Sequence, residues 1–147
     1  MNQPVFEQSP HPISFTTWDS HSEERVNQHF SYFNKQRIMP YTTTDMYREI
    51  LLTPFEKQPS LEHSNHAAKQ SYIVLGLVLI AEANEQVDST SMEGYFPKAL
   101  DELLKFKKKG TKSTGTLVLG FRDSELDWLV NPKKSREPLN EFATIIN

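Results

Sequence analysis

The sequence has 147 residues, with 16 Lys and Arg, 19 Asp and Glu and no Cys, so its formal net charge is −3 at pH 7. The absence of Cys excludes disulfides, thiolate-held metal sites and a cysteine nucleophile, and the charge gives no general attraction to nucleic acid or anionic membranes. A chain of this length can bury about 68–70% of its unfolded surface, and we expect a single domain over residues 1–147.

The apolar segments are too short to cross a membrane. The longest uninterrupted stretch, residues 72–81, has ten residues, whereas a membrane-spanning helix needs roughly 20. The first residues lack the basic start and apolar run of a signal peptide. We therefore expect a cytoplasmic protein with neither a membrane nor a nucleic acid as its partner.

The first third of the chain predicts a strand followed by a helix. Residues 1–10 have no periodicity, and we expect an extended lead-in. Residues 13–18 alternate in the manner of a strand. Ser20 and Glu23 have the spacing of a capping box, which predicts a helix that runs to about Arg37.

The next segment gives a mixed signal over residues 41–60. Residues 46–52 are typical of a helix of two turns, which Thr53 and Pro54 are expected to close.

A long helix is predicted over residues 61–84. It is apolar on nearly every side over residues 72–83, so we expect other elements to cover it all round at the centre of the structure. Gly76 disfavours a helix interior and suggests that another backbone approaches closely there. A second copy of the same helix would explain both features, and this favours a dimer.

The remaining segments predict a turn, a helix and a strand. A short stretch to Met92 leads into a turn at Glu93 and Gly94. Residues 96–97 open a helix whose apolar face is formed by leucines, and the basic run 105–110 is expected to end that helix, since the helix dipole favours cations there. The leucines are Leu100, Leu103 and Leu104.

The clearest strand is predicted over residues 116–121. Leu117, Leu119 and Phe121 are expected on one face of this strand, with the intervening residues on the other. Everything after residue 121 is expected to be loop, with a last apolar patch formed by Phe142, Ile145 and Ile146.

These elements predict an α+β fold with an incomplete sheet. Two clear strands and one doubtful strand are fewer than the four to six that a sheet usually has. The other strands could lie within residues 41–60, in a partner chain, or in sequence that is not present here.

Few residues have the spacing of a catalytic or metal site. His63 and His66 stand three apart on a predicted helix and could bind a metal, but no further ligands recur at a matching spacing, so polar residues of a first helical turn are the simpler interpretation. No serine lies in a G-x-S-x-G elbow, and the five glycines form no phosphate loop. We therefore predict no metal site and assign no catalytic residue.

Two basic clusters could bind phosphate groups. Residues 105–112 contain lysines around Phe106 and could contact nucleic acid, although a solvated helix end explains them as well. Residues 132–136 combine Lys, Ser and Arg, which together suit one phosphate group. A charged surface loop remains the alternative for the second cluster.

The order of motifs resembles one known family. Residues 68–72 (Ala-Lys-Gln-Ser-Tyr), the apolar helix, residues 91–95 (Ser-Met-Glu-Gly-Tyr), the leucine helix, the Leu-Val-Leu-Gly strand and residues 132–138 (Pro-Lys-Lys-Ser-Arg-Glu-Pro) follow in the order of the carboxy-terminal part of FMN-dependent nitroreductases. This family includes oxygen-insensitive NAD(P)H nitroreductases and dihydropteridine reductases. Residues 11–15 resemble the family's central strand, so the resemblance covers nearly the whole chain.

The resemblance implies a nitroreductase-like mixed sheet flanked by helices, and an intertwined homodimer with the long helix in its interface. It implies FMN as cofactor, NAD(P)H as reductant and a small nitroaromatic or quinone as acceptor, reduced in a ping-pong cycle. By position, the residues expected to contact FMN lie on the long helix, in the turn after it and in the second basic cluster. They are Gln70 at the isoalloxazine edge, Ser91, Met92, Glu93 and Gly94 beside the reactive nitrogen, with the Gly94 amide as donor, and Lys134 and Arg136 at the phosphate.

The chain departs from the family pattern at its start. Members usually begin with roughly 70 residues that carry an Arg-x-Ser-x-Arg phosphate motif and an Asn-x-Gln-Pro loop, and this sequence starts after both, with Asn2 as one further residue expected near the flavin. We therefore expect an amino-terminally truncated domain. The alternative is a non-catalytic remnant, or a dimer-forming module that no longer binds flavin.

Overall fold

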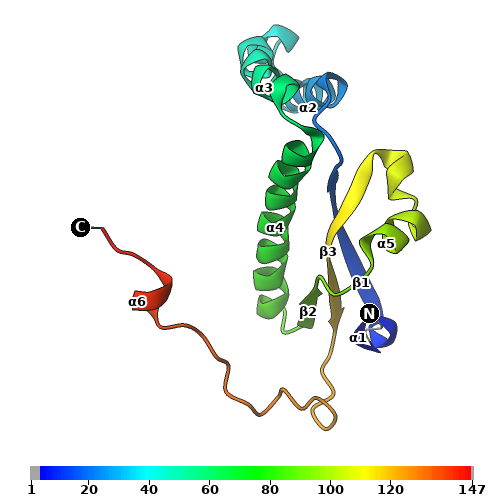
Figure 1. The fold of residues 1–147 in the computed structure, drawn as a ribbon, viewed down its shortest axis with the longest axis vertical. Helices are drawn as coiled ribbons and strands as arrows, with labels where there is room; N and C mark the ends of the chain where they lie inside the picture. The colour runs from blue at the N-terminus through cyan, green and yellow to red at the C-terminus, as the bar shows by residue number, and fades with distance from the viewer. Residues whose placement is uncertain (1–3, 147) are drawn as a thin grey trace.

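The computed structural model describes residues 4–146 and contains a three-stranded antiparallel sheet beside one long helix (Figure 1). The strands β1 (His11–Trp18), β2 (Asp88–Met92) and β3 (Thr111–Gly120) are arranged in the order β1-β3-β2. The long helix, α4 (Ser60–Asn84), lies along the sheet. The predicted α+β class is confirmed, and the stretch before Glu93 forms the third strand.

The central strand β3 forms the core of the sheet. Leu117 and Thr116 have no exposed surface, and Val118 is 3% exposed. Adjacent side chains on a strand point to opposite faces, so burial of all three means that both faces of β3 are covered. The predicted strand began at residue 116 and included Phe121. Phe121 instead follows the strand and is 85% exposed, and the ladder with β1 extends β3 back to residue 111.

Helices α2 (Glu23–Gln36) and α3 (Asp45–Lys57), linked by the short 3₁₀ helix η1 (Tyr41–Thr44), form a helical unit at one end of α4 (Figure 1). The end of α2 agrees with the prediction. Its cap does not, because Ser22 rather than Ser20 accepts a hydrogen bond from the amide of Arg25, at 3.3 Å.

Helix α3 continues past Pro54, which was predicted to close it. Contacts outside the helix stabilise the last turn: the Phe55 ring stacks on His21, with centroids 4.5 Å apart, and the Phe55 carbonyl oxygen lies 2.7 Å from Nε2 of His63. Residues 41–57 are therefore helical, and the hypothesis of further strands in this segment is wrong.

Helix α4 has the predicted extent, but only one side of it is covered by this chain. Ala67 and Leu75 are buried, whereas Ile73, Leu77 and Ile80 are 57%, 61% and 62% exposed. A Cβ placed on Gly76 would have no atom within 4 Å. The expected all-round covering and the close approach at Gly76 are therefore not met within one chain.

The segment between β2 and β3 contains α5 (Pro97–Leu103) and the 3₁₀ helix η2 (Phe106–Lys109). Helix α5 ends at Leu103, before the basic run, and Lys105 has a left-handed backbone with φ of 55°. The predicted leucine face is largely exposed, since Leu103 is 75% accessible. The carboxylate of Asp101 fixes α5 to the sheet by accepting a hydrogen bond from the Ser113 amide at 2.9 Å.

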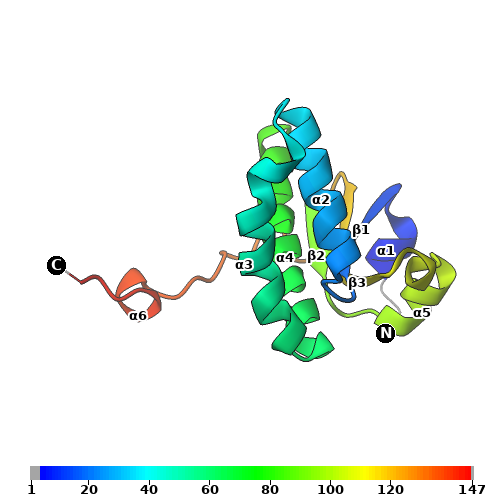
Figure 2. The same ribbon diagram turned by 90° about the horizontal axis from the view of Figure 1, so that it is seen from above.

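Both ends of the described chain contain short helices that the sequence pattern did not predict. Residues expected as an extended lead-in include α1 (Pro4–Gln8), and the predicted loop after β3 contains α6 (Leu139–Phe142). The segment from residue 121 to residue 146, which we call the arm, runs away from the body in both views (Figures 1 and 2). Its apolar patch is exposed, with Phe142 at 76% and Ile146 at 91%.

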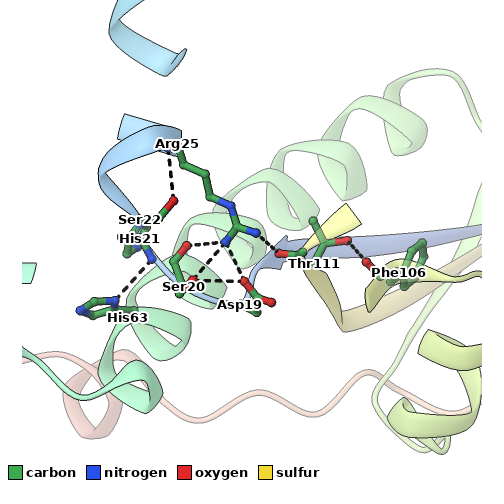
Figure 3. Close-up of polar contacts among 9 residues, drawn as sticks. Asp19, Ser20, His21, Ser22, Arg25, His63, Phe106 and Thr111 are labelled. Carbon is green, nitrogen blue, oxygen red and sulfur yellow. Dashed lines mark hydrogen bonds and ion pairs between the residues drawn. The ribbon is translucent and has the colours of Figure 1, made fainter. Parts of the chain in front are cut away.

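Arg25 joins the loop after β1 to the turn before β3 (Figure 3). Its Nη1 donates to Asp19 Oδ1 and to the Ser20 carbonyl oxygen, each at 2.6 Å, and its Nη2 donates to the Gly110 carbonyl oxygen at 2.9 Å. The hydrogen bond from Arg25 lowers the pKa of Asp19. Arg25 and Gly110 lie 85 residues apart in the sequence, so this guanidinium links distant segments of the chain.

Gly110 is required at this contact for two reasons. Its φ of +62° favours glycine, and a Cβ there would lie 1.7 Å from Arg25 Nη2. Gly110→Ala is therefore expected to lower the free energy of unfolding by at least about 2 kcal/mol, because it adds backbone strain and displaces the guanidinium. Urea denaturation measures this change.

Gly120→Ala is the matched control, since a Cβ there would make an ordinary contact at 3.6 Å with Pro10. Equal stability of the Gly110 and Gly120 variants would contradict the role given to the Arg25 contact.

Candidate functional site

The predicted loop 91–94 lies at the end of β2, beside β3. Ser91 and Met92 are the last residues of β2 and pair with Leu117 and Thr116 of β3. The fully buried Thr116 donates its hydroxyl to the Met92 carbonyl oxygen at 3.1 Å. The Tyr95 amide then donates to the Glu93 carbonyl oxygen at 2.9 Å and closes the turn. The core of the sheet therefore fixes the backbone that enters this loop.

Helix α4 contacts the same loop through Tyr72. The Tyr72 hydroxyl donates to Glu93 Oε1 and also lies 3.0 Å from the Thr114 carbonyl oxygen. Burial and the hydrogen bond to Glu93 raise the pKa of Tyr72 to about 12. The sequence motif included Tyr72, but reasoning from the sequence assigned it no role, because its partner lies 21 residues further along the chain.

Gln70 lies on the other side of the site. Its side chain is exposed and lines a cavity of about 410 Å³ together with Trp18 and Thr17 of β1 and His66 of α4. Because β1 and β2 flank β3 on opposite sides, Gln70 and the 91–94 loop border different edges of the sheet. The structure therefore places Gln70 on α4 and the 91–94 loop beside α4, at different edges of the sheet.

Lys134 and Arg136 belong to the arm, which runs away from the elements that carry the other predicted residues (Figure 1). Both are exposed, and Arg136 Nη1 donates to the carbonyl oxygen of its neighbour Ser135 at 2.6 Å. The arm starts at a fixed point, since Arg122 forms an ion pair with Asp88 of β2 and lowers the pKa of that carboxyl to about 2. Asn2 lies outside the described residues.

The electrostatic surroundings of the two cations suit a phosphate group. Within residues 4–146, neither Lys134 nor Arg136 forms an ion pair with a carboxylate of this chain, so both charges remain available to an anionic ligand. One chain alone, however, does not bring these charges to the 91–94 loop.

The two histidines considered as metal ligands belong to a cluster of rings. His63 Nδ1 accepts from the His21 amide at 3.3 Å (Figure 3), and its Nε2 lies 2.7 Å from the Phe55 carbonyl oxygen, so both ring nitrogens have partners in the chain. The His66 ring lies 5.6 Å from that of His21. Residues 4–146 contain no group of three or more His, Asp or Glu side chains arranged to hold a metal ion.

The first basic cluster, residues 105–112, is also exposed over its three consecutive lysines. Lys107, Lys108 and Lys109 lie in η2, directly before β3. Their exposure is consistent with a solvated helix end, which was the alternative to contact with nucleic acid. No helix within the described residues is long and apolar enough to cross a membrane.

Known proteins with a similar structure contain the same fold. A candidate NAD(P)H:FMN oxidoreductase from Staphylococcus epidermidis superposes with a TM-score of 0.79 at 8% identity, over 97% of this chain and 64% of that protein. A candidate nitroreductase from Bacillus subtilis superposes with a TM-score of 0.80 at 14% identity, over 98% of this chain and 67% of that protein. The chain therefore has the nitroreductase fold.

The sequence comparison agrees with the structural one. The major NAD(P)H-flavin oxidoreductase of Aliivibrio fischeri is 32% identical over 85 residues, which are 58% of this chain and 39% of that protein. No family model matches the sequence. The chain thus spans well under half of this relative's length, and the resemblance predicted from the order of the motifs is confirmed.

The ring cluster generates a prediction about pH. Burial, then the nearby His66, His63 and Arg25, lower the pKa of His21 from its ordinary 6.5. Below about pH 6.5 the unfolded chain therefore binds more protons than the folded chain, and the free energy of unfolding falls as the pH is lowered through this range.

His21→Phe is expected to reduce this pH dependence, because phenylalanine can keep the stacking on Phe55 and the backbone bond to His63 while removing the titrating ring. Urea denaturation at pH 7.5 and pH 5.5 measures the difference. His29→Phe, on an exposed position of α2, is the control and is expected to leave the dependence unchanged. An unaltered pH dependence in His21→Phe would contradict the role of His21.

Proposed function

We propose, from its nitroreductase fold, that the chain supplies the flavin site of an FMN-dependent NAD(P)H oxidoreductase of the nitroreductase family. The observation that carries this proposal is the superposition of 97–98% of the chain on two such folds. The 32% identity with an NAD(P)H-flavin oxidoreductase supports the same class of reaction.

The residues present fit FMN in their chemistry. Lys134 and Arg136 offer two cations to the phosphate, and Arg can bind it through two parallel hydrogen bonds. The 91–94 loop offers backbone and side-chain polar groups to the edge of the ring system, and Gln70 offers an amide beside the aromatic ring of Trp18. In this proposal Ser91, Met92, Glu93 and Gly94 face the reactive nitrogen, and the Gly94 amide is its donor.

A homodimer is part of the proposal, because one chain leaves too much surface uncovered. Its accessible surface is 11849 Å², whereas a compact monomer of 17.0 kDa exposes about 7,700 Å². The excess includes the apolar face of α4 and the arm. Interfaces of obligate dimers bury 2,000–5,000 Å² or more and are strongly apolar. A second copy packed on α4, with each arm extended across its partner, accounts for both surfaces.

The second copy also completes the flavin site. We propose that the interface brings Lys134 and Arg136 of the arms close to the 91–94 loop and Gln70, which lie apart from the arm within one chain. Gly76 then has the role expected from the sequence, since its missing side chain allows the partner's backbone to approach α4 closely.

Bound FMN would accept a hydride from NAD(P)H and pass two electrons to a second substrate. The protein's contribution is to bind and orient both partners in turn, which gives a ping-pong cycle. We propose flat acceptors such as nitroaromatics or quinones, and a cytoplasmic location, where NAD(P)H is available.

The proposal predicts that phosphate binding depends on the arm. The double variant Lys134→Ala/Arg136→Ala is expected to weaken FMN binding by at least about 100-fold, because two charge-assisted hydrogen bonds of about 1.5–3 kcal/mol each are lost. Quenching of FMN fluorescence on titration with protein measures the dissociation constant.

Lys107→Ala/Lys108→Ala removes the same charge from η2 and serves as the control, with affinity expected to remain near that of the unaltered chain. Equal weakening by both double variants would reveal a general charge effect instead. A chain that dimerises but binds no FMN would favour the alternative, a dimer-forming module without flavin.

A further inference from the structure

Tyr72 links three elements at the edge of the proposed flavin site. It belongs to α4, its hydroxyl donates to the side chain of Glu93 in the turn after β2, and the same hydroxyl lies 3.0 Å from the Thr114 carbonyl oxygen of β3. The neighbouring Ser71 hydroxyl lies 2.8 Å from Thr114 Oγ1, which fixes this turn of α4 to the strand a second time.

The 91–94 loop is therefore held from two directions. On the strand side, Thr116 donates to the carbonyl oxygen of Met92. On the helix side, the structure gives the Glu93 carboxylate a hydrogen bond from Tyr72. A Cβ on Gly115 would lie 3.9 Å from the Tyr72 hydroxyl, so Gly115 faces α4. Because adjacent side chains on a strand point to opposite faces, Thr116 points away from α4, and the two attachments lie on opposite sides of the sheet. The main chain of the turn lies between a buried threonine and a helix-borne phenol.

The chemistry of Tyr72 indicates a hydrogen-bond donor to Glu93. A hydroxyl has one proton, and a carboxylate is a stronger acceptor than a carbonyl oxygen. Burial and Glu93 raise the pKa of Tyr72 to about 12, so the phenol keeps its proton at neutral pH. Tyr72 can therefore orient Glu93 as a hydrogen-bond donor at neutral pH.

We propose that Tyr72 is a positioning residue that orients Glu93, and through it the 91–94 loop, against bound FMN. This inference rests on the proposed function, because it assigns the loop to the flavin. Tyr72 acts through Glu93. Loss of the Tyr72 hydroxyl and loss of the Glu93 carboxylate are therefore expected to affect the position of the loop in the same way.

A double-mutant cycle on FMN affinity tests the proposal. Tyr72→Phe keeps the ring and removes the hydroxyl, and Glu93→Gln removes the charge at nearly constant shape. Each single variant is expected to weaken FMN binding about 5–20-fold. The double variant is expected to lose no more affinity than the single variant with the larger loss. Tyr47→Phe, at a 60% exposed position on α3, is the matched control and is expected to bind FMN as the unaltered chain does.

A second readout separates positioning from a purely structural role. At saturating FMN, Tyr72→Phe and Glu93→Gln are expected to shift the absorbance maximum of the bound flavin in the same direction, while Tyr47→Phe leaves it unchanged. A general loss of stability would lower the melting temperature without changing the spectrum of the flavin that remains bound.

The outcomes distinguish this inference from the proposed function. Multiplicative losses of affinity in the double variant, or unchanged affinity in Tyr72→Phe, would overturn the positioning role while leaving the flavin site in place. Failure of the unaltered chain to bind FMN would overturn the proposed function and this inference with it. In that case the same cycle on the free energy of unfolding would still report whether Tyr72 and Glu93 are coupled in the apoprotein.

Discussion

The burial of β3 on both faces is the constraint on which the other elements depend. Strands β1 and β2 supply its hydrogen-bonding neighbours, and α4 covers one face, so Thr116 and Leu117 are completely withdrawn from solvent. A buried threonine must have a hydrogen-bond partner, and Thr116 finds it in the carbonyl oxygen of Met92. The core thereby determines where the turn that follows β2 begins.

The same core is small for a chain of this size. The buried apolar residues among those described are Val26, Ala67, Leu75, Leu117 and Val118, whereas many large apolar side chains remain exposed along α4 and the arm. Exposed apolar surface of this extent marks an interaction site. The α4 face and the arm are therefore the surfaces on which the proposal of a second copy rests.

Periodicity in the sequence predicted the elements whose stability comes from their own pattern. The apolar run of α4 gave its extent almost to the residue, and alternation gave most of β1 and the second half of β3. The parts of elements that depend on distant contacts were not predicted. Helix α3 continues through Pro54 because Phe55 packs against His21 and His63, and such contacts leave no local signal in the sequence.

The candidate site was predicted unevenly for the same reason. The order of motifs proposed the 91–94 loop, Gln70 and the arm's cations as site residues. It did not indicate the bond between Tyr72 and Glu93, because two residues far apart in sequence become partners only through the packing of α4 on β3. Nor could a pattern along one chain show that the arm, which carries Lys134 and Arg136, runs away from the body. That separation is visible only in the fold.

The central claim is that the proposed flavin site requires two copies of this chain, and its mass in solution tests that claim most directly. Light scattering over a range of concentrations should give twice the chain mass of 17.0 kDa. The mass should fall toward that of one chain in Leu77→Asp, which places a charge on the exposed face of α4. A mass of 17.0 kDa at every concentration would contradict the account.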